Sequence, residues 1–263
     1  MDKEIVLSLG NQQVQIDAGE LVGYAIAGHE FIHQKGSPGW RNADTEMFPI
    51  IGPTDAANFR VTTPKGKAVQ DQHGLLRELD YECLEQTSKK AVFKKRYTAN
   101  SVVKNAKFPH KSSEAELSWP YNFEFTKTFL LSDQGLQISF TVHGEEGMPF
   151  MLGYHPAFKL RTTEASIETG SKNWTITKVM SVGSRALHVP NCERILLKDE
   201  KSLEIRTKGF GNFMLWTEVP NMVCIEPITF YPYAVAQEKL HQGFTVFNGK
   251  AKEYSVFLHP LQN

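Results

Sequence analysis

The residue most able to do chemistry is a histidine in the run 153–158 (GYHPAF). Alternate residues of a strand share a face, so His155 would share its face with Gly153 and Ala157. These small neighbours predict an imidazole with room around it for a ligand. An imidazole titrates near neutral pH and can give or take a proton. The structural alternative is a buried histidine that donates to a backbone carbonyl at a strand end.

A second candidate is a glutamate in the run 224–227 (CIEP), which ends the apolar strand expected over 219–228. Glu226 lies in phase with Cys224 and Ile228, so it shares an apolar face. An unpaired carboxylate is costly to desolvate there, and such sites raise carboxyl basicity, which suits a general base. The alternative is a glutamate that pairs with a lysine or arginine at the strand end.

A third candidate is the segment 71–77 (DQHGLLR). A spacing of four places His73 and Arg77 on one face, whether the segment is a strand or a helix. Two hydrogen-bond donors on one face suit a polyhydroxylated or anionic ligand. The alternative is a surface turn at Gly74 with an exposed histidine.

The segment 29–33 (HEFIH) matches the HExxH pattern of zinc enzymes, with His29, Glu30 and His33 as its polar residues. Zinc binding by this motif needs both histidines on one helical face and a third protein ligand. Gly39 occupies the next ligand position of the extended motif and cannot ligate a metal. The surrounding glycines leave room for barely two helical turns, so we expect a strand with Phe31 facing inward and no bound metal.

Composition narrows the class of protein. The chain has 263 residues and a formal net charge of zero, so no overall charge attracts it to nucleic acid or to an anionic membrane. Its three cysteines form no CxxC pair, which indicates reduced thiols and a cytoplasmic setting. No signal peptide and no apolar run of membrane-spanning length is evident. We expect a single domain over residues 1–263, with a small molecule rather than nucleic acid or a membrane as its partner.

Alternation between apolar and polar residues dominates the chain. Phe123, Phe125 and Phe129 alternate with polar residues, and a second alternating run follows the turn 132–135 (SDQG), as in a hairpin. Similar runs recur, separated by glycine, proline, asparagine and aspartate, at 91–97, 174–179, 203–207, 213–216, 244–247 and 253–258. Short helices are expected only near 55–59 and 233–240. The pattern predicts an all-β fold, one large antiparallel β-sandwich.

Four segments occur together in an order that is similar to a known family: 47–52 (MFPIIG), 73–77 (HGLLR), 153–158 (GYHPAF) and 224–227 (CIEP). From about residue 19 to its end, the chain resembles the aldose 1-epimerase (galactose mutarotase-like) superfamily, and within it the bacterial LacX-like branch. The resemblance implies a β-supersandwich.

The resemblance also implies roles for the matched residues. Glu226 would take the proton from the anomeric hydroxyl and His155 would protonate the ring oxygen. The ring would open, the C1–C2 bond would rotate, and the ring would reclose on the other face. His73 and Arg77 would hold sugar hydroxyls or the ring oxygen. This isomerase would need no metal and no redox cofactor.

Four further residues bear on the identity of the sugar. Arg41 stands where related hexose-6-phosphate mutarotases carry an arginine. Trp40 and Trp216 could stack on a sugar, although core packing is the simpler explanation for each tryptophan. Pro53 stands where many family members carry an arginine. The sugar, its phosphorylation, the anomer preference, the oligomeric state and the pathway therefore stay open. The alternatives are a hexose-6-phosphate mutarotase, a noncatalytic carbohydrate-binding protein on the same fold and, third, a zinc hydrolase.

Overall fold

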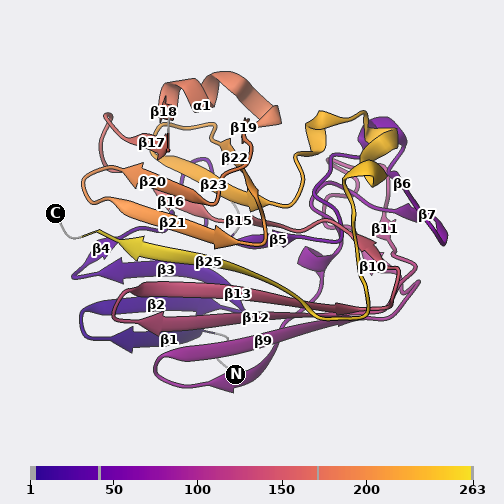
Figure 1. The fold of residues 1–263 in the computed structure, drawn as a ribbon, viewed down its shortest axis with the longest axis horizontal. Coiled ribbons are helices and arrows are strands. Elements are labelled where there is room, and N and C mark those ends of the chain that lie inside the picture. Colours follow the sequence, from indigo (N-terminus) through magenta and orange to yellow (C-terminus); the bar gives the residue numbers. More distant parts are fainter. Residues whose placement is uncertain (1–3, 41–42, 171, 262–263) are drawn as a thin grey trace.

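Two large antiparallel sheets dominate the computed structural model, which describes residues 4–40, 43–170 and 172–261 (Figure 1). The larger sheet has nine strands, in the order β18 (Lys172–Thr175), β17 (Ser166–Thr169), β20 (Arg194–Lys198), β21 (Leu203–Lys208), β25 (Lys252–Pro260), β13 (Gly135–Gly144), β12 (Phe123–Ser132), β9 (Lys90–Tyr97) and β8 (Glu82–Gln86). The second sheet has six, in the order β19 (Leu187–Val189), β22 (Asn212–Trp216), β23 (Met222–Ile228), β15 (Gly153–His155) and β5 (Thr45–Met47), with β16 (Ala157–Lys159) also paired to β23.

Smaller sheets complete the described part of the chain. A four-stranded sheet is formed by β1 (Glu4–Leu9), β2 (Gln12–Asp17), β3 (Glu20–Ile26) and β4 (His29–Glu30). Three two-stranded pairs are β6 (Arg60–Thr63) with β7 (Gly66–Val69), β10 (Val103–Lys104) with β11 (Glu116–Leu117), and β14 (Pro149–Phe150) with β24 (Thr245–Val246). The predicted all-β sandwich is confirmed.

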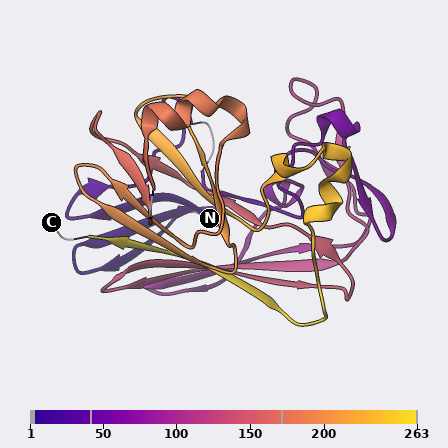
Figure 2. The same ribbon diagram turned by 45° about the horizontal axis from the view of Figure 1, so that its top comes forward.

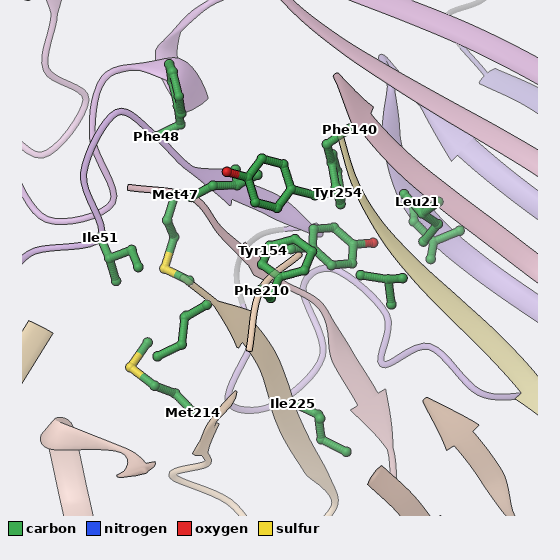
Figure 3. Close-up of a cluster of buried hydrophobic side chains, with 14 of the residues drawn as sticks. Leu21, Met47, Phe48, Ile51, Phe140, Tyr154, Phe210, Met214, Ile225 and Tyr254 are labelled. Atoms are coloured by element: carbon green, nitrogen blue, oxygen red, sulfur yellow. The ribbon is translucent and has the colours of Figure 1, made fainter. Parts of the chain in front are cut away.

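The core lies between the two large sheets. The alternating residues of β12 and β13 supply one side of it, and the hairpin register is the predicted one, with Ser132 opposite Gly135. Tyr154 of β15 reaches across from the six-stranded sheet, and its ring centroid lies 5.1 Å from that of Phe140 (Figure 3). Phe210 also packs in this layer. Burial of large apolar and aromatic side chains is the main stabilising contribution here.

Helices are short and lie outside the sheets. Five are 3₁₀ segments: η1 (Asp55–Ala57), η2 (Leu76–Glu78), η3 (Gly183–Arg185), η4 (Pro232–Ala234) and η5 (Gln237–Gly243). η1, η4 and η5 match the two predicted helical regions. Figures 1 and 2 both show η4 and η5 beside the β6–β7 hairpin at one end of the sandwich. None of the helices in the described ranges approaches the length and apolar character that crossing a membrane demands.

One strand prediction was wrong. The alternating run 174–179 was expected to be extended, but its second half forms the α-helix α1 (Ile176–Val182). Thr175 caps this helix, since its Oγ1 accepts a hydrogen bond from the Lys178 amide at 3.2 Å. Ile176 and Val179 are three residues apart and both buried. This spacing also places them on one face of a helix, so the apolar pattern is compatible with the helix that Thr175 caps.

Candidate active site

Two strands bring the predicted acid and base together on the floor of a cleft. Ala157 of β16 lies opposite Cys224 of β23. Two residues along the chain from each, His155 at the end of β15 and Glu226 of β23 face one another. The His155 Nε2 atom lies 3.4 Å from Glu226 Oε1. Both side chains are buried, with 8% and 2% of their residue surface exposed. The close approach that the resemblance implied is therefore present.

A tight turn holds His73 at the same place. His73 has a φ of 76° and Gly74 a φ of 69°, and a side chain at Gly74 would lie 2.2 Å from the Phe48 carbonyl oxygen. Only glycine fits that position. From η2, the Arg77 guanidinium donates to His73 Nδ1 at 2.8 Å and to Thr45 Oγ1 at 3.1 Å. His73 and Arg77 are therefore neighbours as predicted, but through a turn and a 3₁₀ segment rather than along one strand or helix. The alternative was right about the turn at Gly74 and wrong about an exposed histidine, because His73 is half-buried in the cleft.

This contact fixes the tautomer of His73. A guanidinium can only donate hydrogen bonds, so His73 Nδ1 must accept, and the proton of the neutral ring sits on Nε2. Burial and the charge of Arg77 hold the pKa of His73 well below its usual range. His73 is therefore a neutral side chain with one N–H donor left for a ligand.

The two aspartates that could neutralise Arg77 have other partners. Asp71 Oδ1 accepts from the Lys107 ammonium at 2.9 Å, and Lys107 also donates to the Gln72 carbonyl at 2.6 Å. Asp44 pairs with the buried Lys127 at 2.8 Å. Lys107 thereby braces the turn that carries His73, and Arg77 keeps its positive charge for the cleft.

Three rings surround the imidazole of His155. Their centroids lie at 5.3 Å for Trp40, 5.2 Å for His73 and 6.3 Å for Trp216. The small strand neighbours gave no sign of these rings, which come from other elements, but His155 still lines the cleft and so has room for a ligand beside it. Trp40 and Trp216 both line the cleft, so neither serves the core alone.

The protonation of the central pair follows from its burial. Burial raises the pKa of the Glu226 carboxyl well above its usual value. Burial, reinforced by the charge of Arg77, lowers the pKa of His155 to about 3. Between these limits the pair holds one exchangeable proton, on Glu226, and His155 is neutral.

The cleft above this floor is large and mixed in charge. Its volume is about 1220 Å³, whereas drug-sized ligands typically occupy pockets of roughly 300–1,000 Å³. Met214 and Tyr233 line it as well, and no sequence signal had marked either residue. Among the described lining residues are four basic side chains and six acidic ones, so the wall carries no excess of positive charge: Lys35, Arg77, Lys107, Lys111; Glu20, Asp55, Asp71, Glu78, Glu218, Glu226.

A buried ionic cluster lies behind the site. Strand alternation turns Thr45 toward Arg77 and its neighbour Glu46 the other way, where Lys127 lies 2.7 Å from Glu46 and 2.8 Å from Asp44. Tyr154 donates to Asp44 at 2.5 Å. Burial raises the pKa of Asp44 to about 7 although Lys127 opposes this shift. The sequence contained one signal of this cluster, since Lys127 occupies an apolar position of β12.

The zinc-like motif has a structural explanation. His29 and Glu30 form β4 rather than a helix, as predicted, and Phe31 is buried. The Glu30 carboxylate accepts hydrogen bonds from the backbone amides of Tyr24 and Ile32 at 2.8 and 2.7 Å. His33 Nε2 lies 3.0 Å from the Pro38 carbonyl. The three polar residues of the motif therefore do not converge on one point.

The remaining candidate, Arg41, lies outside the described residues. The described candidates His73, Arg77, His155, Trp216 and Glu226 all line one cleft. An imidazole beside a carboxyl group, a neutral N–H donor and aromatic faces in one cleft could together hold a polyhydroxylated ligand and exchange protons with it.

Comparison with known proteins agrees with this class of site. The aldose 1-epimerase family model matches residues 59–219, more than half of the chain. The chain belongs to this family. The match includes His73, Arg77 and His155 and ends before Glu226.

Solved structures share the fold across their whole length. A galactose mutarotase-like protein from Lactobacillus casei superposes with a TM-score of 0.79 at 16% identity, covering 98% of this chain and 100% of that one. A galactose mutarotase related enzyme from Lactobacillus acidophilus gives 0.76 at 20% identity, with 97% of each chain covered. A GalM/aldose epimerase homologue from C. elegans gives 0.69 at 10% identity, with 98% of each covered. No curated protein sequence matches the chain. At these identities the likeness establishes the fold alone.

Proposed function

We propose that this chain is an aldose 1-epimerase, an isomerase that interconverts the α and β anomers of an aldose. The observation that carries the proposal is the 3.4 Å approach of His155 Nε2 to Glu226 Oε1 on the floor of a cleft wide enough for a sugar. Two such groups can serve the ring oxygen and the anomeric hydroxyl of one pyranose.

Ring opening needs one proton removed and one supplied. The Glu226 carboxylate takes the proton of the anomeric hydroxyl while the His155 imidazolium gives its proton to the ring oxygen, and the bond between C1 and the ring oxygen breaks. The open chain is a neutral aldehyde, Glu226 is now protonated and His155 is neutral. After rotation about C1–C2, the ring closes by the reverse transfers. No atom or electron is gained or lost, so the cycle requires only the pair itself.

Sugar binding itself prepares this pair. Before a sugar binds, the shared proton rests on Glu226, because burial raises the pKa of its carboxyl. A sugar hydroxyl that donates to Glu226 stabilises the carboxylate, and a ring oxygen that accepts from His155 stabilises the imidazolium. The proton can therefore cross the short contact to His155 when the substrate binds.

His73 and Arg77 position the substrate. The Nε2–H of His73 is its free donor, since Nδ1 accepts from Arg77. Arg77 also adds positive charge on the side where negative charge grows during ring opening. Trp216 and Trp40 offer apolar faces beside His155 for the C–H surface of a pyranose.

The charge of the cleft favours a neutral aldose over a phosphorylated one. The described wall holds six acidic and four basic side chains, and one of the six, Glu226, carries the proton of the pair, so no excess of positive charge attracts a phosphate dianion. The one observation for an anionic substrate is that neither Asp44 nor Asp71 neutralises Arg77.

The test is a polarimetric or NMR screen of mutarotation. It compares kcat/KM for glucose and galactose with that for their 6-phosphates, in the wild type and in Arg41→Ala, with the exposed Arg161→Ala as a matched control. We expect faster turnover of the neutral sugars. A phosphate preference that vanishes only in Arg41→Ala would instead identify a hexose-6-phosphate mutarotase. Saturable sugar binding without any turnover would identify a noncatalytic carbohydrate-binding protein.

A further inference from the structure

A cysteine lies beside the acid–base pair and has no part in the proposed reaction. His155, Cys224 and Glu226 each offer one potential ligand atom, and these atoms lie within 4.8 Å of one another. All three residues are buried. Within the ranges that the structure describes, no other group of three such residues is arranged in this way.

The sheet holds these three ligands in place. Cys224 and Glu226 are two residues apart on β23, so they project from the same face of the strand. His155 comes from the neighbouring β15. Zinc bonds to sulfur are about 2.3 Å and bonds to nitrogen or oxygen about 2.0–2.2 Å. A small inward rotation of these side chains would therefore close the group around one ion, with the cleft supplying a water as fourth ligand.

We propose that His155, Cys224 and Glu226 form a site for a thiophilic divalent cation, Zn²⁺ or Cd²⁺, and that an ion bound there blocks the catalytic pair. One sulfur, one imidazole nitrogen and one carboxylate oxygen are a ligand set that such ions prefer. A thiolate and a carboxylate together balance the charge of the ion, so the complex adds no net charge to a buried site. Binding displaces two protons to solvent, the thiol proton of Cys224 and the proton that the pair holds on Glu226.

Burial restricts what else can happen at this sulfur. Cys224 is fully buried, under the apolar group formed by Trp40, Ala157 and Met222. An alkylating reagent or oxidant needs access to the thiolate. His155 and Glu226 line the cleft and Cys224 does not, so an ion would reach the group from the side of His155 and Glu226, and a bulky reagent would have to pass both to meet the sulfur.

Metal binding is tested on the whole protein without any activity measurement. Titration calorimetry with Zn²⁺ and the ultraviolet thiolate-to-metal absorption of Cd²⁺ are measured for the wild type and Cys224→Ala. The half-buried Cys192→Ala serves as the matched control. We expect one ion per chain and a thiolate band, both retained in Cys192→Ala and both lost in Cys224→Ala. Binding that survives in Cys224→Ala, or no one-to-one binding in the wild type, overturns the proposal.

Two further measurements keep the result interpretable. If Cys224→Ala does not fold, His155→Asn serves in its place and must also lose the ion. The mutarotation rate of each protein is measured with Zn²⁺ and again after a chelator has removed the ion. Both rates are compared with the rate of the same protein without metal. Inhibition rests on the proposed function, but binding does not. Metal binding by a protein with no mutarotase activity would therefore contradict the proposed function and leave the metal site standing. Full activity of the wild type with the ion bound would overturn the block of the catalytic pair.

Discussion

Replacing Glu226 by glutamine tests both the chemistry and the electrostatics of the site. The amide keeps the shape of the side chain and removes its ability to exchange a proton. A lost general base typically costs about 10²–10⁴-fold in rate, so we expect mutarotation to fall by at least about 10²-fold. The same substitution removes a buried carboxyl group whose pKa is raised by its surroundings.

The effect on stability has a definite sign. A raised carboxyl pKa means that the folded state binds more protons than the unfolded state between the two pKa values, so wild-type stability falls as the pH rises through this range. Each unit of pKa difference corresponds to about 1.36 kcal/mol. Glutamine does not titrate, so its contribution to the free energy of unfolding does not change with pH. Above pH 4.5, the ordinary pKa of glutamate, the free energy of unfolding of Glu226→Gln minus that of the wild type should therefore rise by up to about 1.36 kcal/mol per pH unit. Any unpaired amide in the variant costs the same at every pH and cancels from this difference.

The assay is urea unfolding of both proteins at pH 4.5 and pH 8, with polarimetry of freshly dissolved glucose and galactose. Glu218→Gln, at the rim of the cleft, controls for the loss of one negative charge. Near-normal turnover in Glu226→Gln would remove this residue from the mechanism. A stability difference that is the same at both pH values would refute the argument from burial.

Three other outcomes are expected. His155→Asn should lower kcat more than it changes KM, because proton transfer matters mainly in the transition state; a pure KM effect measured by initial rates would contradict this. On the acid side, kcat/KM should not fall near pH 6.5, the ordinary pKa of histidine, but only toward about 3, the pKa of His155, where the pair takes up a second proton. On the alkaline side, it should fall at a pH above 4.5, the ordinary pKa of glutamate, where Glu226 loses its proton. Lys127→Met should lower the free energy of unfolding by about 3–5 kcal/mol, because Asp44 and Glu46 would be buried without their cation; urea unfolding with little change would show that the cluster is dispensable.

Much of the fold follows from local pattern. A period of two in the run 123–142, interrupted by a polar turn, specifies a hairpin, and its observed register is the expected one. The run 174–179 shows the limit of this reasoning. Ile176 and Val179 fit both an extended and a helical face, and the capping hydrogen bond of Thr175 favours the helix.

The candidate site was only partly encoded in sequence. Strand phase placed Glu226 on an apolar face. His73 and Arg77 were expected to be neighbours and are, but a turn with positive φ at His73 and Gly74 brings them together rather than a shared strand or helix face. Neither pattern gave the partners of Asp44 and Asp71, because ion pairs between distant segments leave no periodic trace. Lys127 at an apolar position of β12 was the single sequence sign of the buried ionic cluster.

By itself, the sequence determined the β-sandwich, the residues able to carry protons and the strand faces on which they lie, because these depend on side-chain type and a period of two. Only the tertiary structure decided that His155 and Glu226 lie 3.4 Å apart, that three rings enclose the imidazole and that Cys224 stands beside the pair. These facts depend on which strands become neighbours in the sheet and at what register. The pKa values of the pair depend on them too, because desolvation is a property of the assembled core and not of any one segment.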